Sequence, residues 1–269
     1  MTSEDIIQWM PEYNPYTQNV KCFYFIDDKR GIRDFVKFPM TELQDFYGKK
    51  LPAKSEYNKI LLFKKHDFIF GGLFPFEVDY RAEAWFRFFD QLDVDATIRT
   101  QTNGKPVVVT GKQVLGYDNI PAKYENDPLI TAMVNNINQS DFVKPTVPYE
   151  QYNVELKDYL FTIVLKCYYG KYDSLNFRVI NSLYYGTIPL IDKAYDIDNL
   201  QIPSELKQLL VVSNHRDIEE KVKYYRQHPD EYRKLFFQLF DYYIDQKYFT
   251  SSYYQNEFKT YFAGLYKEA

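Results

Sequence analysis

The sequence is poor in the residues that build disulfide frameworks and zinc sites. It has two cysteines, Cys22 and Cys167, and three histidines among 269 residues. The cysteines form no CxxC pair and have no histidine at metal-ligand spacing, which excludes a zinc motif and a disulfide scaffold. Each cysteine lies in or just after an apolar run, so we expect both to be small buried residues.

Long hydrophobic runs are also missing. No apolar run approaches the ~18 residues that a membrane-spanning helix needs, so the sequence predicts no transmembrane segment. The first residues, MTSEDIIQWMPEYNP, are acidic and lack the charge pattern of a signal peptide. We therefore expect a cytoplasmic protein, located in the host cytoplasm if a phage encodes it.

Positive charge is not concentrated anywhere in the chain. The net charge is −4 and no strongly basic block occurs, so the average field does not favour nucleic-acid binding. A local basic cleft is still compatible with 33 lysines and arginines. Aromatic residues make up 19% of the chain, and the minority outside the core can stack on bases or sugar rings.

Strand-like and helix-like runs alternate along the chain, which predicts a parallel α/β sheet. Strands are expected at residues 20–26, 60–63, 68–70, 106–110, 160–165, 190–191 and 209–213, and helices at 80–92, 175–185, 217–227, 230–243 and 251–265. Pro229 should break the last paired helices, and Asn214 or Asp217 should cap the first of them.

A change of pattern follows residue 140. The segment 140–152 contains Pro145 and Pro148 and has no clear period, so it reads as a linker. The sequence therefore predicts two Rossmann-like domains, at 1–145 and 146–250, with a cleft between them. In open α/β folds ligands lie beyond the carboxyl ends of strands. The expected strand ends carry Gly71-Gly72, Thr110-Gly111-Lys112 and Tyr169-Gly170-Lys171.

The most informative segment is residues 173–191, DSLNFRVINSLYYGTIPLI. Asp173 or Ser174 can cap a helix here, and Gly186 can end it in a left-handed conformation. At helical spacing, Leu175, Val179, Ile180 and Leu183 form an apolar arc, and Ser174, Arg178, Asn181 and Tyr185 form the opposite stripe. A helix N-terminus suits a phosphate or diphosphate, with which Arg178 can pair. The alternative is an ordinary amphipathic helix with a solvated polar face.

Residues 181–191, NSLYYGTIPLI, resemble the segment E-A-L-x-x-G-T-P-V-I of nucleotide-sugar glycosyltransferases with two Rossmann-like domains (the GT-B architecture). The G-T-I-P form is also similar to exostosin-like transferases and to phage enzymes that glucosylate hydroxymethylated DNA bases. The resemblance covers residues 157–245. It implies a C-terminal donor domain and a last helix, within 251–269, that crosses back to the first domain.

The resemblance implies a donor-binding set at and just before this helix, to which the residue pattern adds Lys112 after the expected strand at 106–110. The residues we assign to it are Lys112, Tyr169, Gly170, Lys171, Ser174, Asn176, Arg178 and Asn181. Cations and a helix N-terminus aimed at the diphosphate help most as the bond to the leaving group breaks. Asn181 stands where retaining members often have a glutamate. Its amide can bind hydroxyls but brings no charge.

We expect no bound metal or cofactor, with a nucleotide diphosphate sugar, a UDP-sugar first of all, as the donor substrate. The segment Asp196-Ile197-Asp198 has DxD spacing but reads as a solvated turn. An inverting enzyme also needs a general base, for which His66 and Asp67 are the candidates. A retaining enzyme needs no such base.

The sequence thus predicts a glycosyltransferase that moves a hexose or pentose to a hydroxyl acceptor. The first candidate acceptor is a hydroxymethylated or already glycosylated base in double-stranded phage DNA. A surface glycan or a lipid-linked sugar is an alternative. The other class of function is a non-catalytic Rossmann-like binding module, for which the asparagine at position 181 is the best support.

Overall fold

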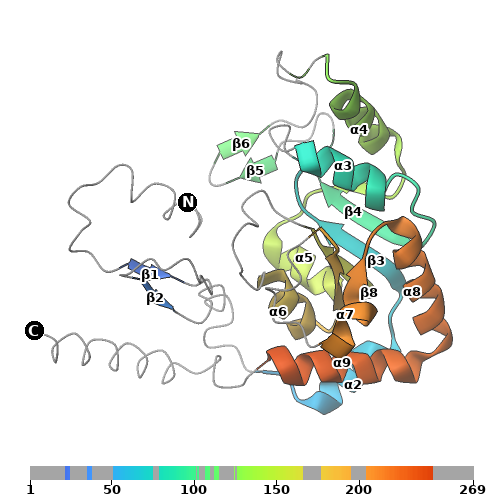
Figure 1. The fold of residues 1–269 in the computed structure, drawn as a ribbon. Helices are drawn as coiled ribbons and strands as arrows, with labels where there is room; N and C mark the ends of the chain where they lie inside the picture. The colour runs from blue at the N-terminus through green and yellow to red at the C-terminus, as the bar shows by residue number, and fades with distance from the viewer. Residues whose placement is uncertain are drawn as a thin grey trace, which may run out of the picture.

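A six-stranded parallel sheet forms the centre of the computed structural model (Figure 1). The structure describes residues 22–24, 35–37, 51–74, 79–100, 102, 107–109, 112–114, 124, 126–165, 177–194 and 204–244. The strands of the sheet are β3 (His66–Gly71), β4 (Ala96–Thr100), β7 (Val143–Pro145), β8 (Tyr159–Val164), β9 (Ile188–Asp192) and β10 (Val211–Val212). Each neighbouring pair is parallel.

The strand order in space is β10-β9-β8-β3-β4-β7. Strands β3, β4 and β7 follow one another from the centre of the sheet to one edge. Strand β8 then pairs with the free side of β3, and β9 and β10 continue to the opposite edge. Counted along the chain, this is the 3-2-1-4-5-6 order of the doubly wound Rossmann fold. The order therefore reverses between β3 and β8.

Helices cover both faces of this sheet. Their bounds are α2 (Lys54–Leu62), α3 (Asp79–Phe88), α4 (Pro128–Gln139), α5 (Tyr149–Leu156), α6 (Phe177–Tyr184), α7 (Ser204–Leu210), α8 (His215–Gln227) and α9 (Pro229–Tyr243). Helix α3 packs against α4 and α8, whereas α5 packs against α6. Helix α9 contacts α2, α6 and α8 and crosses the foot of the molecule as drawn in Figure 1.

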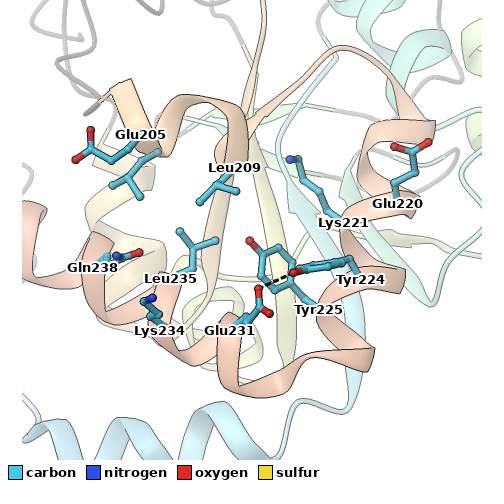
Figure 2. Close-up of a pocket in the computed structure, with 11 residues that line it drawn as sticks. Glu205, Leu209, Glu220, Lys221, Tyr224, Tyr225, Glu231, Lys234, Leu235 and Gln238 are labelled. Atoms are coloured by element: carbon cyan, nitrogen blue, oxygen red, sulfur yellow. Dashed lines mark hydrogen bonds between the residues drawn. The ribbon is translucent and has the colours of Figure 1, made fainter.

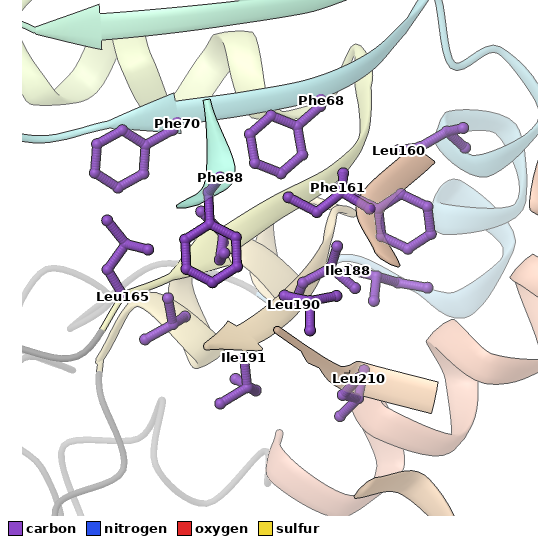
Figure 3. Close-up of a cluster of buried hydrophobic side chains, with 14 of the residues drawn as sticks. Phe68, Phe70, Phe88, Leu160, Phe161, Leu165, Ile188, Leu190, Ile191 and Leu210 are labelled. Atoms are coloured by element: carbon purple, nitrogen blue, oxygen red, sulfur yellow. The ribbon is translucent and has the colours of Figure 1, made fainter. Parts of the chain in front are cut away.

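Side-chain alternation along the central strands explains the two helical layers. Phe68 and Phe70 point toward α3, and Phe70 lies 5.1 Å from Phe89 between ring centroids. Ile69, between them, points to the opposite face and packs with Leu156 of α5. Every residue of β8 is buried, as expected for a central parallel strand covered on both faces. Figure 3 shows Phe68, Phe70 and the side chains that surround them in this core.

Two smaller sheets complete the described backbone. Strands β1 (Cys22–Tyr24) and β2 (Phe35–Lys37) pair in parallel. Strands β5 (Val107–Val109) and β6 (Lys112–Val114) form an antiparallel pair. The strand expected at 106–110 therefore exists, but it belongs to a hairpin and not to the parallel sheet.

Several sequence predictions are confirmed at the level of elements. The strands at 68–70 and 160–165 and the helix near 80–92 are present, and helices α8 and α9 meet at Pro229. Asn214 caps α8, since its side-chain oxygen accepts from the N–H groups of Arg216 and Asp217. Gly186 follows α6 with φ +85°, the left-handed conformation expected of it.

Two predictions of local structure are wrong. Residues 60–63 are not a strand but the end of α2, because the apolar run continues a helical period in which Tyr57 and Leu61 are both buried. Residues 140–152 are not a linker. They contain β7, an edge strand in which only Val143 is buried, and the first turn of α5. Such a short, largely polar edge strand leaves almost no sequence signal.

The expected domain boundary at residue 145 falls inside the sheet. Strands β3, β4 and β7 precede it and β8, β9 and β10 follow it, and β3 is hydrogen-bonded directly to β8. The described parts of the two expected domains thus share one sheet, because α5 returns the chain to the centre instead of starting a new sheet.

The C-terminal helix expected within 251–269 lies outside the described residues. None of the described helices has the length and apolar character needed to cross a membrane.

Candidate functional site

The carboxyl ends of β3 and β8 lie side by side where the strand order reverses. In doubly wound sheets this position forms a crevice, because the helices after the two central strands lie on opposite faces of the sheet. Gly71 and Gly72 stand at and just beyond the end of β3, and α6 is the first described helix after β8. Open α/β sheets bind their ligands at this position.

Arg178, in the first turn of α6, reaches this strand end. Its Nη1 donates a hydrogen bond to the backbone oxygen of Gly71, 107 residues earlier in the chain. The centre of its guanidinium lies 6.0 Å from the ring centroid of Phe70. A methyl group added to Gly72 would lie 3.6 Å from Nη2 of Arg178. The structure therefore brings together Arg178 and the Gly71-Gly72 pair, which the sequence singled out separately.

Tyr152 of α5 lies on the same strand end. Its ring packs on Gly71 so closely that a methyl group added to the glycine would lie 2.5 Å from Cε2. Burial raises the pKa of the Tyr152 hydroxyl, while the positive charge of Arg178 opposes the shift. The phenol is therefore protonated near neutral pH and can act as a hydrogen-bond donor. Tyr152 belongs to the segment that the sequence assigned to a linker, so sequence reasoning missed it.

Asn181 does not face the crevice in the way the sequence suggested. It is 3% exposed, and its Nδ2 donates to Oδ1 of Asn153 in α5 over 2.7 Å. Its own Oδ1 is buried with no hydrogen-bond partner in the described part of the chain. The polar stripe of α6 is thus turned toward α5 at this position. Three members of the predicted apolar arc, Val179, Ile180 and Leu183, are buried, and the fourth, Leu175, lies outside the described residues.

His66 and Asp67 lie at the other end of β3. His66 Nδ1 is 2.7 Å from Asp95 Oδ2, and Asp67 Oδ1 accepts from Arg226 Nε over 2.7 Å. Five residue steps of about 3.3 Å separate His66 from Gly71, so the predicted base pair stands roughly 17 Å from the strand end that meets Arg178. The structure does not bring these two groups together. Described contacts tie His66 and Asp67 to the β4 entry and to α8.

The remaining predicted donor residues cannot be placed in the same way. Lys112 begins β6, but its side chain lies outside the described residues. Tyr169, Gly170, Lys171, Ser174 and Asn176 lie in the undescribed segment 166–176 between β8 and α6, and the DxD-spaced segment 196–198 is also outside. In the described ranges, no cluster of histidine, cysteine or carboxylate side chains is arranged to hold a metal ion.

A groove lies away from the strand-order reversal. Helices α7, α8 and α9 enclose a groove of ≈ 860 Å³ (Figure 2). Leucines and tyrosines form its apolar part, and carboxylates, lysines and an amide complete it: Leu206, Leu209, Leu235, Tyr224, Tyr225, Glu205, Glu220, Glu231, Lys221, Lys234 and Gln238. The Tyr224 hydroxyl donates to Glu231 Oε2 over 2.5 Å, which joins α8 to α9. No residue that the sequence assigned to catalysis or donor binding lines this groove.

No protein-family model and no curated protein sequence matches the chain. The functional argument therefore rests on the arrangement of residues at the sheet.

Proposed function

We propose that the protein is a glycosyltransferase that takes a sugar from a nucleotide diphosphate donor, a UDP-sugar first of all. The observation that carries this proposal is the position of Arg178 at the end of β3, where the strand order reverses. Doubly wound sheets bind nucleotides at this point. The segment 181–191, which resembles the donor domain of GT-B enzymes, follows directly as the rest of α6 and β9.

The chemistry of the transfer explains the need for an arginine here. When the bond between the sugar and the diphosphate breaks, negative charge grows on the leaving phosphate. A guanidinium offers several N–H donors in a planar fork that matches phosphate oxygens. A cation held next to that charge stabilises the transition state more than the ground state. In this proposal Arg178 binds the diphosphate, and the described sheet is the donor-side Rossmann-like unit of a GT-B-like enzyme.

The acceptor we propose first is a hydroxymethylated or already glycosylated base in double-stranded DNA, on the resemblance of the G-T-I-P segment to phage enzymes. We expect hydroxymethylated DNA incubated with the protein and mixed nucleotide sugars to gain the mass of a hexose or pentose. Mass spectrometry of the digested nucleosides measures this gain. Unmodified DNA is the control. A surface glycan or lipid-linked sugar that gains mass in place of the DNA would move the acceptor to that class.

One observation favours a different class of function, a non-catalytic Rossmann-like binding module. The amide of Asn181 is buried and hydrogen-bonded to Asn153, so in this arrangement it does not contact a sugar. A protein that keeps the scaffold and binds a partner through an aromatic surface would not need this contact. Thermal stabilisation by uridine diphosphate separates the two classes, because the absence of a shift with any nucleoside diphosphate would favour the binding module.

Replacement of Arg178 by alanine should weaken the binding of uridine diphosphate by roughly 10- to 100-fold. This is the effect of losing charge-assisted hydrogen bonds worth about 1.5–3 kcal/mol. Isothermal titration calorimetry on the full chain gives the dissociation constants, and thermal unfolding with and without the nucleotide gives an independent readout.

A matched control is Arg233→Ala, which removes an arginine of α9 that pairs with Asp230 on the surface. It should bind uridine diphosphate like the wild type. If both arginine variants bind equally well, the nucleotide does not lie at α6. If the wild type binds no nucleoside diphosphate at all, the proposed donor class is wrong.

A further inference from the structure

Two asparagines form a buried contact between α5 and α6, which pack against each other (Figure 1). Asn153 and Asn181 are each 3% exposed, and Nδ2 of Asn181 donates to Oδ1 of Asn153 over 2.7 Å. The remaining acceptor, Oδ1 of Asn181, is buried and receives no hydrogen bond within the part of the chain that the structure describes. Because a buried acceptor without a partner lowers stability, the stability of the fold gives no reason for an amide at this position.

The contact between the two amides is directional, whereas the apolar packing of α6 is not. Val179, Ile180 and Leu183 are buried on the other side of the helix, and the burial of apolar surface has no preferred direction. A hydrogen bond weakens steeply when its angle departs from the preferred range. The amide pair therefore selects one position of α6 relative to α5.

The position of α6 decides where Arg178 stands. Asn181 follows Arg178 by three residues, nearly one helical turn, so both side chains extend from the same side of the helix. Ser182 Oγ donates to the backbone oxygen of Arg178 over 2.6 Å, which ties this turn together. A shift of α6 at Asn181 would thus move the backbone from which Arg178 reaches the oxygen of Gly71.

From this arrangement we propose that Asn153 and Asn181 are positioning residues for Arg178: their hydrogen bond sets the place of α6 and thereby the place of the guanidinium at the end of β3. Rigid support of this kind matters because a misplaced donor loses most of its value to a ligand. The inference rests on the proposed binding of a diphosphate by Arg178. It adds that the amide pair serves ligand affinity and not stability, so the two properties should respond differently when the pair is replaced.

The first test is the double variant Asn153→Leu with Asn181→Leu in the full chain. Leucine has nearly the shape of asparagine, and replacing both partners of a buried hydrogen bond by apolar groups is close to neutral or stabilising. We expect a urea midpoint at or above that of the wild type. Uridine diphosphate should bind about three- to tenfold more weakly, the effect of one misdirected hydrogen bond. Uridine, which lacks the phosphates, should bind as it does to the wild type.

The variant Asn153→Asp should give the reverse pattern. It keeps an oxygen that accepts from Nδ2 of Asn181, but the burial of a carboxyl group lowers stability. We therefore expect a lower urea midpoint and the wild-type affinity for uridine diphosphate. The control Tyr232→Phe removes another buried hydrogen bond, which runs from its hydroxyl to the backbone oxygen of Leu160. It too should lower the midpoint and leave the affinity unchanged.

A triple variant shows whether the pair acts through the arginine. When Arg178→Ala is added to the double leucine variant, uridine diphosphate should bind no more weakly than it binds to Arg178→Ala alone.

Each outcome decides the inference. Wild-type affinity for uridine diphosphate in the double leucine variant would overturn it and leave the proposed function intact. A midpoint well below that of the wild type in this variant, an equal loss of uridine affinity, or a further loss in the triple variant would assign the pair a structural role instead. A wild-type protein that binds no nucleoside diphosphate would remove the proposed function, and with it this dependent step.

Discussion

Replacing Lys64 with methionine should abolish most of a rise in stability that we expect between about pH 7 and pH 9.5. Lys64 is 7% exposed, and its Nζ donates to the backbone oxygen of Lys157 over 2.8 Å. Burial lowers the pKa of this ammonium to about 7, and the nearby carboxylate of Asp158 offsets only part of the shift.

The direction of the effect follows from the two states. In the unfolded chain the pKa of a lysine is about 10.4, well above its value in the folded protein. Between these values the unfolded state binds the extra proton, so the free energy of unfolding rises with pH by up to about 1.4 kcal/mol per unit. Below pH 7 both states are protonated and this contribution no longer changes. Tyrosines set the upper end of the pH range over which stability rises. Burial raises the pKa of tyrosines such as Tyr57, and this shift lowers the free energy of unfolding as the pH rises further.

Urea unfolding followed through the fluorescence of the buried Trp85 measures this dependence. The Lys64→Met variant should be the more stable protein near pH 7. Near pH 9.5 it should be less stable by about 1 kcal/mol, because it lacks the hydrogen bond to Lys157. Lys59→Met, an exposed position on the same helix, should keep the wild-type slope. A Lys64→Met variant with the wild-type slope would mean that the folded protein holds this lysine charged.

The central part of the fold was predictable because its signals are strong and local. The run at 160–165 is apolar apart from Thr162, which is typical of a strand that is buried on both faces. Pro229 and Asn214 mark helix ends by mechanisms that operate within a few residues. The edge strand β7 has no comparable signal, because it buries Val143 alone and its neighbours Lys144 and Pro145 are exposed. The sequence therefore showed α/β alternation without showing that one sheet contains both halves.

The candidate site was predictable only in part, since both ends of β3 carry polar or glycine residues. His66 and Asp67 are the first two residues of the strand, Gly71 is its last residue, and Gly72 follows it. The chain direction alone places the glycines at the carboxyl end, where ligands bind in open α/β sheets. Which strand lies beside that end was not predictable, because it depends on the pairing of β3 with β8, which joins residues about 90 positions apart. Tyr152 was missed for the same reason, because it meets the end of β3 through a contact with Gly71, 81 residues earlier in the chain.

Replacement of Asp192 by leucine should destabilise the fold by about 2–3 kcal/mol. Asp192 ends β9 with its side chain fully buried, and its Oδ2 lies 3.2 Å from Nη2 of Arg87 in α3. Its other oxygen accepts from the backbone N–H of Ala194 over 2.9 Å. Removing one partner of a buried ion pair costs about 3–5 kcal/mol. The smaller value here reflects the side chain of Arg87, which is 32% exposed and can regain part of its hydration.

The double variant Arg87→Met with Asp192→Leu should recover most of this loss, because two apolar side chains of similar volume replace the ion pair. Asp241→Leu serves as the control, since it breaks an exposed pair with Lys54 and should cost no more than about 1 kcal/mol. Urea midpoints of the four proteins measure these differences. A loss in Asp192→Leu no larger than in Asp241→Leu would show that the carboxylate at the end of β9 adds no net stability. A double variant less stable than Asp192→Leu would show that Arg87 stabilises the fold through contacts other than this pair.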